Sequence, residues 1–286
     1  MAERTAETAA AAGTVDIGGD ITVNRLGCGA MRLTGPGVWG PPPNPAEALA
    51  VLRRAVELQV NFIDTADSYG PEVSERLIAE ALYPYPDDLV IATKGGMVRP
   101  GPDEWVPNGR PEHLRAACES SLRRLRLEQI PLYQLHRPDP RVPFDESVGA
   151  LVTLKDEGKI RHIGLSNVTD EQIDQAERLT PIVSVQNRYN MLDRESDPIV
   201  DRCAWQDMTF IPWAPVREAG ESQAALIIAE RHHATPTQVM LAWLLARAPV
   251  MLPIPGTASV SHLEENVGAA GLELGPDELA ALNQNR

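Results

Sequence analysis

Four side chains capable of acid–base chemistry stand at or just after the ends of apolar runs. Asp64 closes one run and Tyr69 follows it five residues later, while Lys94 and His136 close two further runs. An apolar run that ends abruptly in polar residues predicts a buried strand whose C-terminal end opens into a loop. The C-terminal strand ends of a parallel barrel form its catalytic face. We therefore expect these four side chains to meet at one site.

Proton transfer is the chemistry that these four residue types suit, and reduction of a carbonyl group is a reaction that needs it. The carbon needs a hydride donor and the oxygen needs a proton donor, for which Tyr69 is the candidate, although a free phenol has a pKa of about 10. The ammonium of Lys94 would lower this pKa by up to about three units if it lay ~4 Å away. Asp64 would keep Lys94 charged and in place, and His136 would donate to the carbonyl oxygen or orient it. The alternative is a purely structural ion pair and a histidine that caps a loop.

The segments that must position these residues alternate between strand-like and helix-like patterns. A hairpin is predicted at residues 14–23, and strands are predicted at 26–29, up to 64, 89–94, 131–136, 160–165, 182–185, 209–211 and 250–254. Helices are predicted at 45–58, 73–82, 111–125, 144–157, 171–179, 197–205, 222–233, 236–247 and 261–267. This order predicts an α/β fold, a single (β/α)8 TIM barrel over residues 14–286 with an N-terminal β-hairpin and active-site loops on the C-terminal face. Residues 34–43 and 95–110 are less regular and predict loops at the mouth.

Composition excludes several classes of protein. The 286 residues, 43% of them hydrophobic, suffice for the core of one barrel. The net charge of -14 argues against nucleic acid and membrane surfaces as partners, and no apolar run approaches the ~18 residues of a membrane span. Three cysteines without metal-like spacing predict reduced thiols in the cytoplasm and no metal site. Residues 1–13, rich in alanine and with both charge signs, predict a disordered tail.

From Arg25 to about Asn283 the sequence resembles the aldo-keto reductase family. The four residues above match the family's catalytic tetrad position by position. Residues 29–37 and 80–85 resemble a bacterial branch that includes pyridoxal reductases. The resemblance implies a monomeric cytosolic enzyme that reduces an aldehyde or ketone with NADPH, and pyridoxal is the leading named substrate. The alternative is a catalytically quiet, nucleotide-binding regulatory protein on the same fold.

Polar side chains at later strand ends predict the nicotinamide end of a cofactor site. A nicotinamide carboxamide needs one donor and one acceptor, and the resemblance assigns this role to Ser166, Asn167 and Gln186. Trp213 stands where the family usually carries an aromatic ring, commonly tyrosine, that stacks on the nicotinamide. A buried core tryptophan and loop-capping amides are the alternatives.

The segment from Pro253 to Asn266 predicts the phosphate end of the same site. A glycine turn at Gly256 that leads into a helix N-terminus suits a phosphate through backbone N–H groups and the helix dipole. The turn up to His262 carries neither Lys nor Arg, so NADH is the alternative cofactor. It also carries no carboxylate and offers three hydroxyl groups, so NADPH is expected.

The first strand adds a third segment to this predicted cofactor site. The cofactor-binding residues expected from these observations and from the resemblance are Gly29, Ala30, Met31, Ser166, Asn167, Gln186, Trp213, Pro215, Gly256, Thr257, Ser259, His262, Glu265 and Asn266. The last two match family residues that contact adenine. The first strand lacks the third glycine of the dinucleotide fingerprint, which disfavours a Rossmann fold.

Overall fold

A curved parallel sheet forms the centre of the computed structural model, which describes residues 7–217 and 219–284. Neighbouring strands pair in parallel, so their C-terminal ends point to the same side. This confirms the predicted α/β class and places the predicted strand ends on one face. In the order of the sheet the strands are β11 (Thr209–Phe210), β10 (Ser184–Gln186), β9 (Ile160–Ser166), β8 (Ile130–Leu135), β5 (Val90–Gly95), β4 (Phe62–Asp64) and β3 (Cys28–Gly29).

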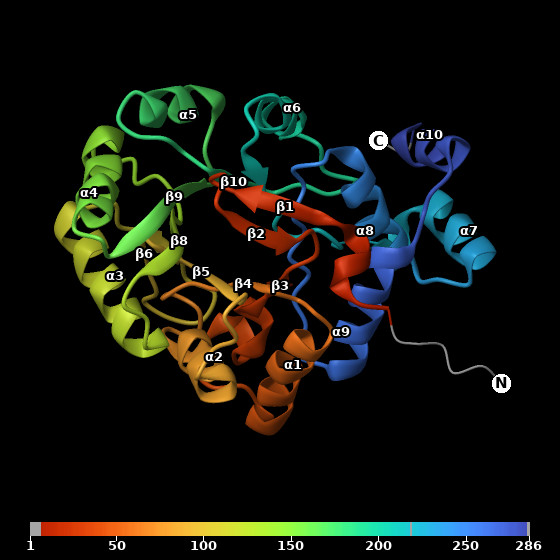
Figure 1. The fold of residues 1–286 in the computed structure, drawn as a ribbon, viewed down its shortest axis with the longest axis horizontal. Helices are drawn as coiled ribbons and strands as arrows, with labels where there is room; N and C mark the ends of the chain where they lie inside the picture. Colours follow the sequence, from red (N-terminus) through yellow and green to blue (C-terminus); the bar gives the residue numbers. More distant parts are fainter. Residues whose placement is uncertain (1–6, 218, 285–286) are drawn as a thin grey trace.

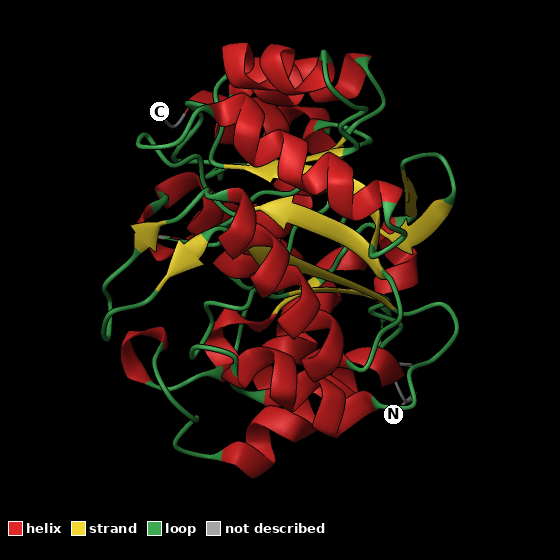
Figure 2. Ribbon diagram, turned by 90° about the vertical axis from the view of Figure 1, so that its left-hand side faces the viewer, coloured by secondary structure: helices red, strands yellow, loops and turns green. Residues whose placement is uncertain are grey.

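Helices surround the sheet in Figure 1, and the side view in Figure 2 shows helices above and below the strands. Their starts follow local signals, as at α1, where Asn44 accepts a hydrogen bond from Glu47 N at 3.2 Å and Pro45 occupies the first turn. The sequence analysis does not predict α10. The helices are α1 (Pro45–Glu57), α2 (Val73–Leu82), α3 (Pro111–Leu125), α4 (Phe144–Asp156), α5 (Asp170–Glu177), α6 (Asp197–Trp205), α7 (Gln223–His232), α8 (Pro236–Arg247), α9 (Val260–Val267) and α10 (Pro276–Gln284).

The eighth predicted strand, residues 250–254, forms no regular strand. It nevertheless lies between β11 and β3, because Leu252 N donates to Phe210 O at 2.9 Å and Gly27 N donates to Pro253 O at 2.9 Å. Pro253 has no N–H group, so the ladder is interrupted where a regular strand would continue it. The segment bonds to both edges of the seven-stranded sheet, which is consistent with a (β/α)8 barrel.

The predicted N-terminal hairpin is present as β1 (Thr14–Ile17) and β2 (Ile21–Asn24), paired antiparallel around a glycine turn. It crosses the centre of the sheet in Figure 1. Alternate hairpin side chains such as Ile17 belong to one apolar cluster with Phe62 and Leu132, which come from two strands of the sheet. The hairpin therefore covers one end of the sheet interior.

Part of the predicted disordered tail is ordered. The 3-10 helix η1 (Ala9–Ala12) contacts β2 and the 3-10 helix η5 (Gly268–Gly271), and its residue Ala9 is fully buried and donates from its backbone N to Leu58 O, at the end of α1, at 2.9 Å. Short alanine side chains allow this close approach, which corrects the prediction for residues 7–13. Residues 1–6 of the predicted tail lie outside the described residues.

The irregular stretch at residues 95–110 contains a second small hairpin. Its strands β6 (Met97–Val98) and β7 (Val106–Pro107) pair antiparallel. Strands of two residues are too short for an alternating pattern, so the sequence analysis predicts only a loop there. Across the described residues no helix is long and apolar enough to cross a membrane.

Candidate active site

Lys94, near the end of β5, connects two of the predicted catalytic residues. Its Nζ donates to Asp64 Oδ1 at 2.5 Å and to Tyr69 Oη at 3.3 Å. A third bond, to Thr65 O at 2.9 Å, completes the donors of the ammonium. The three side chains are buried, with exposed fractions of 0% for Lys94, 2% for Asp64 and 6% for Tyr69. A buried charge with a full set of partners is a rigid and strongly coupled arrangement.

Burial and charge act in opposite directions on these side chains. Burial alone would lower the pKa of Lys94, but attraction to Asp64 and to Tyr69 raises this pKa overall, so the ammonium stays charged. For Tyr69, burial raises the pKa, Lys94 lowers it and Asp64 raises it, and the net change is an increase. The predicted lowering of the Tyr69 pKa is therefore wrong, because removing the phenolate from water outweighs the attraction of the ammonium. Tyr69 is a protonated phenol at neutral pH.

His136 follows β8 directly and lies beside Tyr69. The two rings meet edge to face, with centroids 5.8 Å apart and an interplanar angle of 84°. Nδ1 of His136 lies 3.3 Å from Ser68 Oγ. Burial, followed by the positive charges of Lys94 and two arginines, lowers the pKa of His136 well below its usual value. The imidazole is therefore neutral at physiological pH.

Two glutamines hold the second oxygen of Asp64. Gln134 Nε2 donates to Asp64 Oδ2 at 3.1 Å, and Gln186 Nε2 donates to the same atom at 2.9 Å. The sequence analysis missed Gln134, although it stands two residues before His136 and thus on the same side of β8. Gln186 was predicted at the carboxamide, and its Oε1 accepts no hydrogen bond among the described residues.

Asn167 orients the predicted stacking ring. Its Oδ1 accepts from Trp213 Nε1 at 3.1 Å, and its Nδ2 donates to Ser166 Oγ at 2.9 Å and to His136 O at 3.0 Å. The amide of Asn167 is thus engaged by protein atoms, and Ser166 Oγ donates to Gln186 O at 2.9 Å. Trp213 is only half-buried, which does not fit a core tryptophan.

The first strand and the turn after residue 255 lie against each other. Gly29 N donates to Pro255 O at 3.3 Å, and a Cβ added to Gly256 would lie 2.9 Å from Gly29 O and 3.4 Å from Arg32 Cγ. Both glycines are therefore required by close backbone approach. Ala30 and Met31 begin the next turn, η2 (Ala30–Leu33), beside this contact. The sequence analysis missed Arg32, whose exposed guanidinium has no hydrogen-bond or ion-pair partner within the described part of the chain.

A carboxylate reaches the start of α9 from another helix. Glu47 in the first turn of α1 accepts a hydrogen bond from Val260 N at 3.1 Å through its Oε1. The expectation that no carboxylate stands at the phosphate turn holds for the sequence from Gly256 to His262 but fails in three dimensions. The sequence gives no signal for this contact, since its two residues are 213 positions apart.

The other predicted cofactor residues differ in their accessibility. Ser259 N donates to Thr257 Oγ1 at 3.1 Å, which shapes the turn, and His262 is exposed on the first turn of α9. Glu265 Oε1 accepts from a threonine hydroxyl at the start of α8 at 2.7 Å. Asn266 and the predicted Pro215 are buried. These residues belong to the turn that precedes α9 or to α9 itself, apart from Pro215, which follows Trp213.

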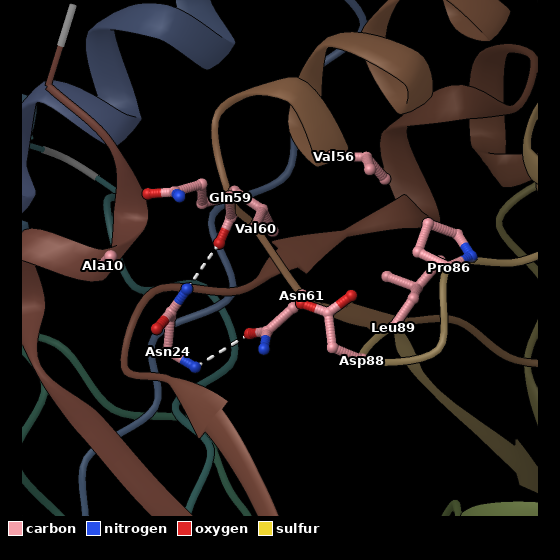
Figure 3. A pocket seen from close by; sticks show the side chains of 9 residues that line it. All are labelled: Ala10, Asn24, Val56, Gln59, Val60, Asn61, Pro86, Asp88 and Leu89. Carbon is pink, nitrogen blue, oxygen red and sulfur yellow. Dashed lines mark hydrogen bonds between the residues drawn. The ribbon is translucent and has the colours of Figure 1, made fainter.

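A pocket of about 290 Å³ lies away from these groups, next to residues that precede β4 and β5 (Figure 3). Asn24 and Asn61 line it, but Asn24 N already donates to Asn61 Oδ1 at 2.8 Å and Asn24 Nδ2 donates to Gln59 O at 2.7 Å. None of the predicted site residues belongs to its lining. Among the described residues no group of three or more His, Cys, Asp and Glu side chains is arranged to hold a metal ion.

A family model, related sequences and solved structures all place this chain beside members of one family. The sequence model of the aldo/keto reductase family matches residues 25–285. The chain is 48% identical to an uncharacterized oxidoreductase of Schizosaccharomyces pombe, over 99% of this chain and 93% of that protein. It is 43% identical to the pyridoxine 4-dehydrogenase of Escherichia coli, over 93% of this chain and 96% of that protein. A solved aldo/keto reductase from Klebsiella pneumoniae, in complex with NADP and acetate, matches with a TM-score of 0.80 at 27% identity and covers 95% of this chain and 94% of its own.

The family match extends over nearly the whole chain and includes every residue of the site described above. Both curated relatives are at least 43% identical over nearly their full lengths. On this evidence the chain belongs to the aldo/keto reductase family of oxidoreductases.

Proposed function

We propose that the protein reduces an aldehyde or ketone to the alcohol with NADPH. The observation that supports this most is the position of Lys94 Nζ, 2.5 Å from Asp64 Oδ1 and 3.3 Å from Tyr69 Oη at the C-terminal ends of parallel strands. These buried side chains, together with the neutral His136, supply the proton donor and the fixed charge that carbonyl reduction needs.

Tyr69 is the general acid in this proposal. NADPH, when bound, supplies the hydride that the carbonyl carbon accepts. The carbonyl oxygen takes the proton of Tyr69 Oη, so C=O becomes CH–OH and the phenol becomes a phenolate. Lys94 stabilises that phenolate through its ammonium, and Asp64 holds the ammonium in place. In the tautomer of His136 that carries its proton on Nε2, Nδ1 accepts from Ser68 Oγ and the Nε2–H donates to the carbonyl oxygen.

The residues at the other strand ends fit a nicotinamide cofactor. The free Oε1 of Gln186 can accept from a carboxamide, and Trp213 offers a ring face whose orientation Asn167 holds. Gly256 and the exposed Arg32 suit a phosphate group. The NADP complex of the Klebsiella pneumoniae relative supports the same cofactor, and NADH is the alternative.

Pyridoxal, which would yield pyridoxine, is the proposed substrate. This choice is supported by 43% identity to the pyridoxine 4-dehydrogenase of Escherichia coli. We also propose a monomer that works in the cytoplasm. The unpaired and buried Cys28, Cys118 and Cys203 suit a reducing compartment.

The substitution Tyr69→Phe tests the proposed acid. Loss of the proton donor should reduce kcat with NADPH and 4-nitrobenzaldehyde by ~10²–10⁴-fold, while the affinity for NADPH, measured by tryptophan fluorescence, stays unchanged. Tyr85→Phe is the matched control, since its hydroxyl donates to Leu125 O at 2.7 Å away from the site and its loss should spare activity.

A Tyr69→Phe variant that keeps most of kcat would exclude Tyr69 as the acid. A wild-type protein that binds NADPH but oxidises it with no aldehyde of a panel that includes pyridoxal would instead be a nucleotide-binding regulatory protein.

A further inference from the structure

Arg99, next to the small hairpin strand β6, is a buried cation outside the predicted site. It is 9% exposed, and within the described residues no carboxylate forms an ion pair with it. A buried guanidinium is costly unless all of its N–H groups find acceptors. The acceptors that bind the N–H groups of Arg99 therefore indicate the structural role of this residue.

All five N–H groups of Arg99 are used by backbone carbonyls. Nε donates to Glu104 O at 2.7 Å, Nη1 donates to Val38 O at 2.9 Å and Ser68 O at 3.1 Å, and Nη2 donates to Gly37 O at 2.8 Å and Gly101 O at 3.4 Å. These carbonyls belong to three separate segments: the turn η3 (Pro36–Val38), the loop that carries Tyr69, and the loop between β6 and β7. One side chain thus joins three loops around the site.

The guanidinium of Arg99 also stacks on the ring of Trp105, which lies beside Tyr69 and His136. Its Cζ lies 3.6 Å from the ring centroid of Trp105 and 5.9 Å from that of Trp39. Trp105 in turn meets Tyr69 edge to face at 6.3 Å and His136 at 6.2 Å. Both tryptophans are only half-buried, so part of each ring faces outward.

We infer that Arg99 is a positioning residue that holds Trp105 beside Tyr69 and His136, so that the proposed active site selects flat aromatic aldehydes over aliphatic ones. The inference rests on the proposed function, since it names the substrate class of the same site. A flat ring gains most from a fixed aromatic wall, whereas a flexible aliphatic chain has no preferred face to match. The five bonds and the stacking need the planar fork of arginine, which lysine with three donors cannot reproduce.

The substitution Arg99→Lys keeps the charge and removes the fork. We expect KM for 4-nitrobenzaldehyde to rise about tenfold, the factor that corresponds to one lost aromatic contact, with little change in kcat. KM for butyraldehyde and the affinity for NADPH should stay the same. Arg115→Lys is the matched control, because Arg115 is an exposed arginine paired with Glu157 on the outer surface. Equal losses with both aldehydes, or no loss with either, would overturn the inference.

Trp105 provides a second test in case Arg99→Lys folds poorly. Trp105→Ala should reproduce the selective rise in KM for 4-nitrobenzaldehyde. Trp105→Phe, which keeps an aromatic ring, should bring KM most of the way back to the wild-type value. Calorimetric binding of 4-nitrobenzyl alcohol separates this inference from the proposed function, because it requires no turnover. If the wild-type protein binds the alcohol but reduces no aldehyde, the proposed function is wrong. The inference still holds in that case if Trp105→Ala weakens the binding of the alcohol. If the wild-type protein reduces both aldehydes and Trp105→Ala changes KM equally for both, the proposed function stands and the inference is wrong.

Discussion

At the scale of single residues, the protonation of Tyr69 determines the pH range of the proposed reaction. Burial raises its pKa above the usual value of about 10, and the opposing effects of Lys94 and Asp64 do not reverse this. The pKa of His136 is shifted in the other direction, well below its usual value. Between these two pKa values the phenol keeps its proton and the imidazole stays neutral.

The rate of reduction should therefore be independent of pH across the neutral range. Reduction needs the protonated phenol, so kcat/KM should fall only when pH rises through the raised pKa of Tyr69, above about pH 10. The measurement is a profile of kcat/KM for 4-nitrobenzaldehyde with NADPH from about pH 6 to pH 10. A fall centred between about pH 7 and pH 9 would contradict the raised pKa.

At the scale of elements, a buried ion pair fastens two helices to the strand that carries Lys94. Glu75 on α2 is fully buried; its Oε1 accepts from Thr93 Oγ1 at 2.6 Å and its Oε2 accepts from Arg124 Nε on α3 at 2.6 Å. Thr93 is the neighbour of Lys94 on β5. The pair thus connects the helix packing outside the sheet to the position of Lys94, the lysine of the proposed catalytic site.

Breaking this pair from one side should destabilise the fold. Arg124→Met would leave the carboxylate of Glu75 buried without its cation, which costs ~3–5 kcal/mol in the free energy of unfolding. Urea denaturation measures this. Arg76→Met is the control, since the exposed pair of Arg76 with Glu72 is worth only ~0–1 kcal/mol. The double variant Glu75→Gln and Arg124→Met should recover part of the loss, and an Arg124→Met cost as small as that of the control would contradict the argument.

At the scale of the whole molecule, the fold brings two opposite charges to the turn proposed to bind the cofactor phosphates. Glu47 comes from α1 and accepts a hydrogen bond from Val260 N at 3.1 Å. Arg32 comes from the turn after β3 and has its Cγ within 3.4 Å of the Cβ position of Gly256. A carboxylate at a helix N-terminus opposes a phosphate there, and a guanidinium nearby favours it.

The substitution Glu47→Gln should improve the preference for NADPH over NADH. Removing one partly exposed negative charge near a 2′-phosphate changes the affinity ratio by about two- to fivefold, and the gain should shrink as salt rises. Dissociation constants for both cofactors, measured by tryptophan fluorescence at low and high salt, test this. Glu230→Gln on α7 is the control. An equal change for NADH and NADPH would show that Glu47 lies away from the 2′-phosphate.

Local patterns were enough to predict most elements and the strand ends at which the candidate site residues stand. Apolar runs that end in polar residues identified the strand ends at Asp64, Lys94 and His136, and capping residues identified the start of α1 at Asn44. The prediction failed where the pattern was too short or was interrupted. The hairpin of β6 and β7 has two residues in each strand, and Pro253 interrupts the ladder of the eighth strand.

The sequence by itself determined the alternation of strands and helices, the resemblance to a family, and the residue types at the strand ends, because each of these depends on neighbours along the chain. Only the tertiary structure decided which polar groups meet across it. Gln134 and Gln186 reach Asp64 over 70 and 122 positions, Arg99 reaches Gly37 over 62, and Glu47 reaches Val260 over 213. Burial likewise set the sign of the Tyr69 pKa shift, because desolvation depends on everything packed around the phenol rather than on the charge of Lys94 alone.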